Sequence, residues 1–391
     1  MKINVFLNNI DQDFIDKCNL YHPKQIGNTI TLFDNNDDDL DLSIFKLAII
    51  GVEEERNSFD NKGCREAPNA IRKQFYQLFN HWSELKIIDL GNIKTGFEIE
   101  DTYYALNNVV MTLMKYHIVP IILGGSQDLT FPIYQVYENT GKLVNITSID
   151  SRFDIGQDNE KLNSNSYLSY IILHQPNFLF NYTNIGYQNY YIDNQNIKLM
   201  KDLLFDIHRI GKIRNNIELT EPLIRNADIL TIDISAFKAA EAPGIRNNSP
   251  NGFSSEEGCQ MTRYAGLNNK LTSIGFFEYN PSYDINNVTA NSISQMIWYF
   301  IEGFNSRIYD FPHHESLDFK RYNVKLENID DDIVFLCHKI TGKWWMDLSF
   351  KSKNREKYER HHYIPCSQED YDLTMQNEIP DKWWQFYQKL M

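Results

Sequence analysis

The feature of this sequence that most constrains its fold is a series of short apolar runs separated by helix-like segments. Six runs are rich in Ile, Leu and Val: "FKLAIIGV", "LKIIDLG", "HIVPIILGG", "LVNITSID", "ADILTIDIS" and "KLTSIGFFEYN". They are continuous rather than alternating, which is typical of strands covered on both faces. Helix candidates lie among them at residues 67–82 and 289–304, the second with Thr289 as its expected N-cap. The alternation predicts an α/β fold with a doubly wound parallel sheet.

Changes in composition along the chain predict three parts. Residues 1–44 form an N-terminal appendage, and residues 45–305 hold all six apolar runs. Residues 306–391 change character and form a C-terminal addition. We expect this addition to contain a hairpin turning at Thr341-Gly342 and to end in the aromatic-rich tail "PDKWWQFYQKLM".

Aromatic and histidine pairs in the C-terminal addition allow more than one interpretation. The pairs Trp344-Trp345 and Trp383-Trp384 anchor either a partner protein or the addition itself against the main sheet, and we expect the latter. The tandem histidines at 313–314 and 361–362 lack the spacing of a metal site. We expect these histidines at the surface.

Charge and cysteine usage exclude several classes of protein. The 391 residues carry a net charge of −14, which argues against nucleic acid or an anionic membrane as the main partner. Five widely separated cysteines form no CxxC pair, so neither a disulfide framework nor a zinc ribbon is indicated. The N-terminus lacks a signal-peptide pattern, and no apolar stretch approaches eighteen residues. We therefore expect a soluble, cytoplasmic protein without membrane insertion.

Acidic side chains follow several of the predicted strands. Asp150 and Asp154 follow one apolar run, Asp233 lies within another, and Glu278 ends a third. Taken singly, such an acid is more often a loop residue or an N-cap than a ligand. Since the carboxyl ends of parallel strands meet at one edge of a sheet, we expect these four side chains to converge on one crevice. The loop "GGSQDLT" after a further run leads to the same edge.

Five motifs, in the same order along the chain, carry a resemblance to a known family. "APNAIR" is similar to the family's "APxAIR" helix, "GGSQDLTFP" to G-G-D-H-S-x-T, "DSRFD" to D-A-H-x-D, and "DISAFKAAEAPG" with "FEYNP" to its later metal and substrate motifs. Residues 45–305 thus resemble the ureohydrolases arginase, agmatinase and formimidoylglutamase, and "NYTNIGYQNYY" and "IHRIGKIR" look most like formimidoylglutamase. The resemblance implies an arginase-like three-layer α/β/α sandwich, and hydrolysis of guanidine or formimino C–N bonds by two bridged Mn²⁺ ions.

The resemblance also implies six metal-ligand positions, of which three have lost their ligand. They read, in order, Gln127, Asp150, Arg152, Asp154, Asp233 and Ser235. Gln127 and Arg152 stand where the family has histidine, and Ser235 stands where it has aspartate. A guanidinium cannot coordinate a cation. Lys238 also replaces an acid of the family's pattern.

The three remaining aspartates are expected to repel one another, which would raise their pKa values. Arg152, placed among them, would relieve that repulsion. We therefore expect its guanidinium to lie within hydrogen-bonding distance, about 2.7 to 3.2 Å, of at least one of the three carboxylates.

The favoured hypothesis is an inactive homologue without cofactor, acting as a binding or interaction protein. Glu278 would be a substrate-binding remnant for a small cationic ligand, and a protein partner or a homo-oligomer unlike the family's trimers and hexamers is expected. The alternative is a formimidoylglutamase-like hydrolase of amidine or formimino C–N bonds. It would use one Mn²⁺ or Mg²⁺ held by Asp150, Asp154 and Asp233, with the Gln127 oxygen as a further ligand. A different small-molecule activity in the same crevice remains open.

Overall fold

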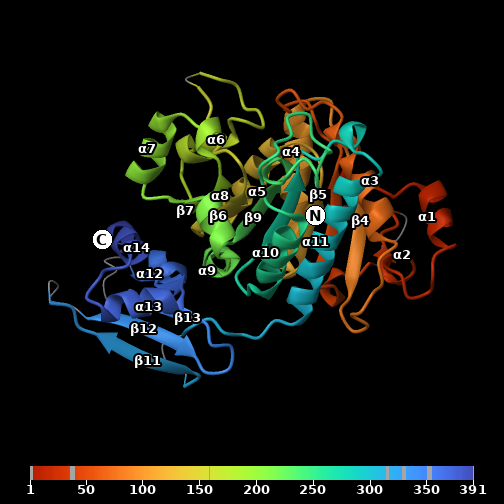
Figure 1. Ribbon diagram of the computed structural model, residues 1–391. Coiled ribbons are helices and arrows are strands. Elements are labelled where there is room, and N and C mark those ends of the chain that lie inside the picture. Colours follow the sequence, from red (N-terminus) through yellow and green to blue (C-terminus); the bar gives the residue numbers. More distant parts are fainter. Residues whose placement is uncertain are drawn as a thin grey trace.

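A large, mainly parallel sheet forms the centre of the molecule (Figure 1). The computed structural model describes residues 3–35, 40–157, 159–313, 317–327, 332–349 and 355–390. The sheet has ten strands in the order β1-β4-β3-β5-β10-β9-β6-β7-β8, with β2 also paired to β4. Their bounds are β1 Leu7–Asn8, β2 Thr31–Leu32, β3 Leu47–Val52, β4 Ile87–Ile93, β5 Val119–Leu123, β6 Val144–Ile149, β7 Leu179–Tyr187, β8 Asp206–Arg209, β9 Ile229–Asp233 and β10 Ser273–Phe277. Every pairing is parallel except that of β1 with β4, so the predicted sheet is confirmed.

Helices cover both faces of this sheet, as the three-layer prediction requires. Along β3, Leu47 and Ile49 pack into one core while Ala48 and Ile50 pack into the other, because successive side chains of a strand point to opposite faces. The first core is covered by α1 (Gln12–Cys18), α2 (Ile26–Thr29), α3 (Ala67–Phe75), α8 (Ile210–Asn215), α9 (Thr220–Arg225), α10 (Ser255–Leu267) and α11 (Val288–Asn305). The second is covered by α4 (Ile99–Lys115), α5 (Thr130–Gln135), α6 (Tyr167–Leu173) and α7 (Asn194–Asp202).

Two predicted helices differ from the expectation at their ends. Helix α3 ends at Phe75, not near residue 82, because the following segment hydrogen-bonds to the N-terminal part of the chain. The N–H groups of Ile26 and Gly27 donate to its carbonyls. Helix α11 has Asn287 rather than Thr289 as its N-cap residue. The Thr289 hydroxyl instead accepts the N–H of Gly244, at 2.8 Å.

The N-terminal segment extends the central sheet. Strand β1 pairs antiparallel with residues 92–93 of β4, and β2 pairs parallel with residues 88–89 of the same strand. Ile3 and Leu7 of this segment are buried in the second core. The N-terminal segment therefore contributes two strands to the central sheet.

The C-terminal residues build a second, antiparallel sheet with its own core. It has the order β11-β12-β13-β14, and β12 and β13 form a hairpin whose turn contains Thr341 and Gly342. Trp383 of the last helix is buried in the core of this sheet, and Trp345 is buried on β13, whereas Trp384 is 49% exposed. The elements are β11 Phe319–Val324, β12 Ile333–His338, β13 Trp344–Asp347, α12 Arg355–Tyr358, β14 Tyr363–Cys366, α13 Gln368–Met375 and α14 Asp381–Leu390.

Polar and stacking contacts hold this second sheet against the main one. The Arg225 guanidinium of α9 lies 4.2 Å above the Trp345 ring, and Arg360 pairs with the buried Asp228. His361 stacks on Phe180 of β7, with 3.9 Å between ring centroids. His361 and His362 are thus buried, contrary to the expectation, because the C-terminal unit packs against β7 at this point. His313 is exposed, and residue 314 lies outside the described residues.

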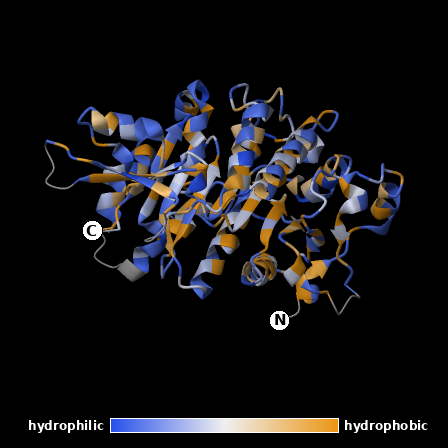
Figure 2. Ribbon diagram, turned by 90° about the horizontal axis from the view of Figure 1, so that it is seen from below, coloured by the Kyte–Doolittle hydropathy of each residue, from blue (hydrophilic) through white to orange (hydrophobic). Residues whose placement is uncertain are grey.

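Hydrophobic residues concentrate along the central strands (Figure 2). Within the described ranges, no helix combines the length and apolarity needed to cross a bilayer. All five cysteines are free thiols, and four of them are buried.

Candidate functional site

Four adjacent strands deliver the candidate residues to one edge of the sheet. Strands β5, β10, β9 and β6 are parallel neighbours. Gln127 follows β5, Glu278 follows β10, Asp233 ends β9, and Asp150 follows β6. The crevice expected from the sequence is therefore formed by segments more than 150 residues apart in the chain.

Asp150, Asp154 and Asp233 form a compact buried cluster. One carboxylate oxygen from each lies within 4.8 Å of the others, and the three residues are 1%, 7% and 6% exposed. One oxygen of Asp150 accepts the Arg152 N–H at 2.8 Å, and one of Asp233 accepts the Ser235 N–H at 2.6 Å. The second oxygens of Asp150 and Asp154 are buried without a hydrogen-bond partner among the described residues. Unpaired carboxylate oxygens facing one another suit a hard cation.

Burial raises the pKa values of all three acids, and charge repulsion adds to it for two of them. Burial is the larger cause in each case, and the neighbouring carboxylates raise the pKa values of Asp150 and Asp154 further. The charge of Arg152 acts in the opposite direction on Asp154 and Asp233. The expected rise in pKa is therefore present, and Arg152 offsets only part of it.

Gln127 and Ser235 lie beside this cluster. The amide nitrogen of the Gln127 side chain donates to the Tyr167 hydroxyl at 3.4 Å, and its amide oxygen is buried without a partner in the described part of the chain. The Ser235 hydroxyl lies 3.0 Å from that of Ser151 and 3.4 Å from an oxygen of Asp150. The amide oxygen of Gln127 is thus unpaired, although Gln127 does not line the cavity that the acids share, whereas the Ser235 hydroxyl is occupied.

The expected hydrogen bond from Arg152 to the acids is absent, so that prediction is wrong. The guanidinium carbon lies 4.7 Å from the centre of the Tyr191 ring, and within the described ranges the side chain forms no ion pair with a carboxylate. The Arg152 backbone is fixed on both sides, since its N–H donates to Asp150 and its carbonyl accepts from Asn184 at 2.7 Å. This turn directs the side chain toward the aromatic ring, where a cation–π contact holds it.

Lys238 does not contribute to the cluster either. Its ammonium lies 3.9 Å from Glu241, three residues along the same loop. Within the described residues, Arg152 is therefore the cation that acts on the acids, and it does so without direct contact.

Glu278 is held by two hydrogen bonds at the same edge. One carboxylate oxygen accepts the backbone N–H of Gln127 at 2.9 Å, and the other accepts from the Asn61 side chain at 2.8 Å. Burial, followed by the charge of Asp233, raises its pKa. Its φ of 64° and the φ of 51° at Asp154 lie in the left-handed region, which non-glycine residues rarely adopt. Two strained acids therefore border one cavity, of about 100 Å³, which Asp150 and Asp233 also line.

Gly124 and Gly125 set the path of the loop that carries Gln127. Both have positive φ, 74° and 77°. A Cβ on Gly124 would lie 2.6 Å from Pro68, and one on Gly125 would lie 2.4 Å from Leu129. Only glycine combines this backbone geometry with this close packing.

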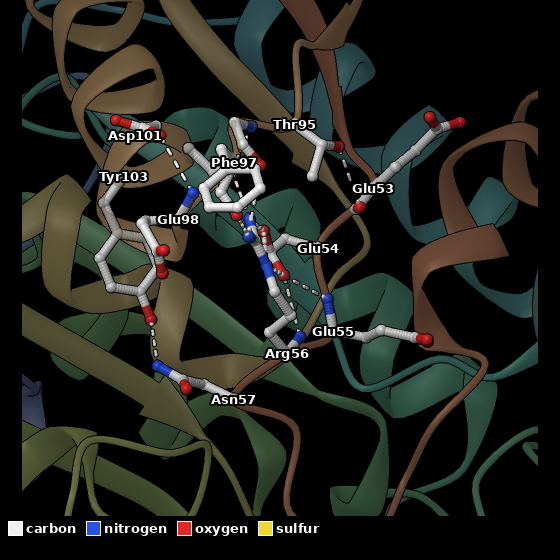
Figure 3. Close-up of polar contacts among 12 residues, drawn as sticks. Glu53, Glu54, Glu55, Arg56, Asn57, Thr95, Phe97, Glu98, Asp101 and Tyr103 are labelled. Atoms are coloured by element: carbon white, nitrogen blue, oxygen red, sulfur yellow. Dashed lines mark hydrogen bonds and ion pairs between the residues drawn. The ribbon is translucent and has the colours of Figure 1, made fainter.

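A second polar network ties the loops at this sheet edge together, and the sequence analysis missed it. The Arg56 guanidinium pairs with the buried Glu54 and donates to two carbonyls of the loop at 96–97 (Figure 3). Tyr103 of α4 donates to Asp128, in the loop that carries Gln127. The only sequence signal was charged residues directly after a buried strand, in "GVEEER".

Comparison with known proteins assigns the family. The profile of the Arginase family matches residues 45–302, about two-thirds of the chain. The chain belongs to the arginase family. Among curated relatives of this arginase-family protein, the formimidoylglutamase of Staphylococcus haemolyticus is 24% identical over 280 residues, which are 65% of this chain and 85% of the relative. The formimidoylglutamase of Streptococcus gordonii is 25% identical over 309 residues, covering 73% and 92%.

Solved structures agree with this assignment at the level of the fold. The Trypanosoma cruzi formiminoglutamase crystallised with Mn²⁺ superposes with a TM-score of 0.65 at 18% identity, over 73% of this chain and 99% of the other. The Bacillus subtilis formimidoylglutamase gives a TM-score of 0.65 at 17% identity, over 77% and 95%. The expected resemblance to formimidoylglutamase is confirmed.

The residues of this chain do not fit the two bridged Mn²⁺ ions that the family resemblance implies. In the described part of the chain, the cluster able to hold a metal consists of three carboxylates. Gln127 and Arg152 occupy the expected imidazole positions, and Arg152 points to Tyr191. The clustered carboxylates of Asp150, Asp154 and Asp233, with unpaired oxygens on Asp150 and Asp154, fit a single hard cation instead.

Proposed function

We propose that this arginase-family protein holds one divalent cation, Mn²⁺ or Mg²⁺, at Asp150, Asp154 and Asp233, and binds a small cationic ligand beside it without hydrolysing it. The observation that carries the proposal is the buried cluster of Asp150, Asp154 and Asp233, in which one oxygen of Asp150 and one of Asp154 are unpaired among the described residues. This modifies the sequence-based hypothesis of a cofactor-free protein, because Arg152 does not neutralise the acids by direct contact.

Charge supports one cation rather than none or two. Three carboxylates carry a charge of −3 when ionised, and Arg152 at +1 with one divalent ion at +2 balances them. With Glu278 ionised as well, one divalent ion leaves a charge of −1 that a cationic ligand balances, whereas two ions leave +1 before any cationic ligand binds, and no ion leaves −3. Uncompensated buried charge is costly in either direction.

The same arrangement argues against the family's hydrolysis. A water bridging two metal ions is activated by both, and the ion pair clamps the attacking and leaving groups. With a single site, this clamp cannot form. In this chain, the ion would supply positive charge for orienting a ligand, while the acids position the ion and Glu278 lies beside them.

Glu278 supports the cationic character of the ligand. It shares the cavity with the three aspartates, and both of its oxygens accept hydrogen bonds from neutral donors, which leaves its charge unpaired. An ammonium, amidinium or guanidinium group would provide the missing countercharge.

Metal stoichiometry tests the proposal. The protein is stripped with EDTA, dialysed against Mn²⁺, and analysed by plasma mass spectrometry. We expect one ion per chain, lost in Asp154→Asn, and no release of product from formimino or guanidino substrates. Two ions per chain, or none at saturating Mn²⁺, would overturn the proposal.

One observation favours a second candidate, a hydrolase with an altered one-metal site. The cavity of about 100 Å³ beside the acids has room for a few water molecules at about 30 Å³ each. Product release that rises with bound Mn²⁺ and disappears in Asp154→Asn would support this candidate over a binding protein.

A further inference from the structure

Three cavities follow one another from the acid cluster to the surface. The acid cavity, of about 100 Å³, shares Phe59, Arg152 and Tyr191 with an outer cavity of about 220 Å³. The outer cavity in turn shares Ile155 and Gln157 with a groove of about 1030 Å³. The three cavities are therefore neighbours, and the middle one is lined largely by polar side chains, among them Glu160, Asp193 and Asn196.

The groove is mainly apolar and lies along α6 and α7, which are adjacent on one side of the sheet (Figure 1). Its lining includes Phe131, Ile172, Leu173, Leu199 and Leu203. Leu173 is 75% exposed and Leu199 is 40% exposed. Covering such side chains with an apolar group is favourable because it removes apolar surface from water.

The two ends of the path have opposite chemistry. The inner end presents four carboxyl groups, with Arg152 as the single cationic lining residue of that cavity. The outer end is apolar. We propose that this site takes an elongated amphiphilic ligand, with a cationic head in the acid cavity and a hydrocarbon chain in the α6–α7 groove. The cationic head group rests on the proposed function, whereas the hydrocarbon part of the ligand rests on the groove.

The shape of the path favours such a ligand over a protein partner. The occupant of the groove has to continue into a cavity of about 100 Å³, which admits a narrow chain and its head group but no folded surface. The intermediate stretch carries the carboxylates of Glu160 and Asp193. Both oxygens of Glu160 accept from neutral donors, Gln157 and Asn163, so its charge is not balanced there. A flexible hydrocarbon chain fits both the narrow and the wide parts.

Chain length provides the test. Ethylguanidine and octylguanidine, below its aggregation concentration, are titrated by calorimetry into the full-length protein, both with Mn²⁺ and in EDTA. A fully buried methylene strengthens binding about fourfold. If half of the surface of the six extra methylenes is buried, octylguanidine binds about fiftyfold more tightly than ethylguanidine, with one molecule per chain.

Leu199→Asp places a carboxylate in the groove. We expect it to reduce the octyl advantage to less than about fivefold while the ethylguanidine affinity and the Mn²⁺ content stay unchanged. The matched control is Leu20→Asp, which adds the same charge at a leucine 86% exposed and away from the groove. Because each variant adds negative charge to a chain already at −14, nonspecific attraction of a cation would increase in both.

The outcomes separate the two proposals. Equal affinity for both guanidines, or an octyl advantage unaffected by Leu199→Asp, overturns the ligand class proposed here, whatever the metal content. In another outcome, the protein binds no Mn²⁺ and still binds octylguanidine more tightly than ethylguanidine in EDTA, with this difference lost in Leu199→Asp. That result overturns the single-cation site and supports the amphiphilic ligand.

Discussion

Replacing Asp154 with asparagine should stabilise the metal-free protein while removing its response to metal. The Asp154 carboxylate is buried, and one of its oxygens lacks a partner in the described part of the chain. Burial, followed by the charge of Asp233, raises its pKa from 3.8 to about 7. Asparagine has the same shape without the charge, and its amide can donate to a neighbouring carboxylate.

The sign of the pH dependence follows from the raised pKa. The folded protein binds this proton more tightly than the unfolded chain, so the ionised carboxylate destabilises the fold. The penalty is absent below about pH 4, grows between about pH 4 and pH 7, and is constant above. The difference between 3.8 and about 7 corresponds to at most about 4 kcal/mol. The repulsion falls when any one of the neighbouring acids takes up a proton, so Asp154 does not bear all of it. We therefore expect Asp154→Asn to raise the free energy of unfolding by about 1 to 2 kcal/mol at pH 8.

Thermal unfolding followed by circular dichroism measures both effects. In EDTA at pH 8, Asp154→Asn should melt above the wild type, and the difference should shrink toward pH 4. With Mn²⁺ at a hundred times its dissociation constant, the wild type should gain about 2.7 kcal/mol and the variant nothing.

Asp128→Asn is the matched control. Asp128 is a buried acid at the same sheet edge, but it accepts hydrogen bonds from Ser126 and Tyr103. Asparagine keeps one acceptor oxygen, so a donor loses its partner, and this variant should be less stable by about 1 to 3 kcal/mol while keeping the Mn²⁺ response. If Asp154→Asn behaves like this control, the reasoning about unpaired acids is refuted.

Three further expectations concern the same site and the assembly. Gln127→His, Arg152→His and Ser235→Asp together should raise bound Mn²⁺ from one to two ions per chain by plasma mass spectrometry; a folded triple variant with unchanged content would contradict this. Glu278→Gln should weaken ethylguanidine binding about tenfold in calorimetry, about 1.4 kcal/mol, without changing the metal content; unchanged affinity would assign Glu278 a purely structural role. Light scattering should return an assembly other than the family's trimer or hexamer, and a hexamer in dilute solution would count against this.

The central strands were predictable from sequence because their apolar runs are continuous. Strand β7 was missed, since Asn181, Thr183 and Asn184 interrupt its apolar pattern although all three are buried. Their polarity is satisfied locally, as the Asn181 amide donates to Asp206 at 2.9 Å. A pattern based on hydropathy cannot distinguish such a strand from a loop.

The acid cluster was predictable for a different reason, because the ends of parallel strands meet at one edge. The direction of the Arg152 side chain was not. It depends on Tyr191, which follows β7 and whose position relative to the β6 loop exists only in the folded chain. Sequence placed Arg152 beside the acids, but it did not show that Tyr191, at the end of the segment "NYTNIGYQNYY", would lie against its guanidinium.

The remaining strain at this edge gives one more argument for a bound cation. Left-handed backbone at Asp154 and Glu278 costs about 1 to 3 kcal/mol at each position, in addition to the repulsion of the acids. The hydrogen bonds to Glu278 offset part of this, but the unpaired oxygen of Asp154 has no such compensation among the described residues. A divalent ion would neutralise the charge and coordinate that oxygen at once. Binding of the ion would therefore relieve the repulsion among the acids, and this relief would add to the free energy of binding. A site built of neutral ligands has no such repulsion to relieve.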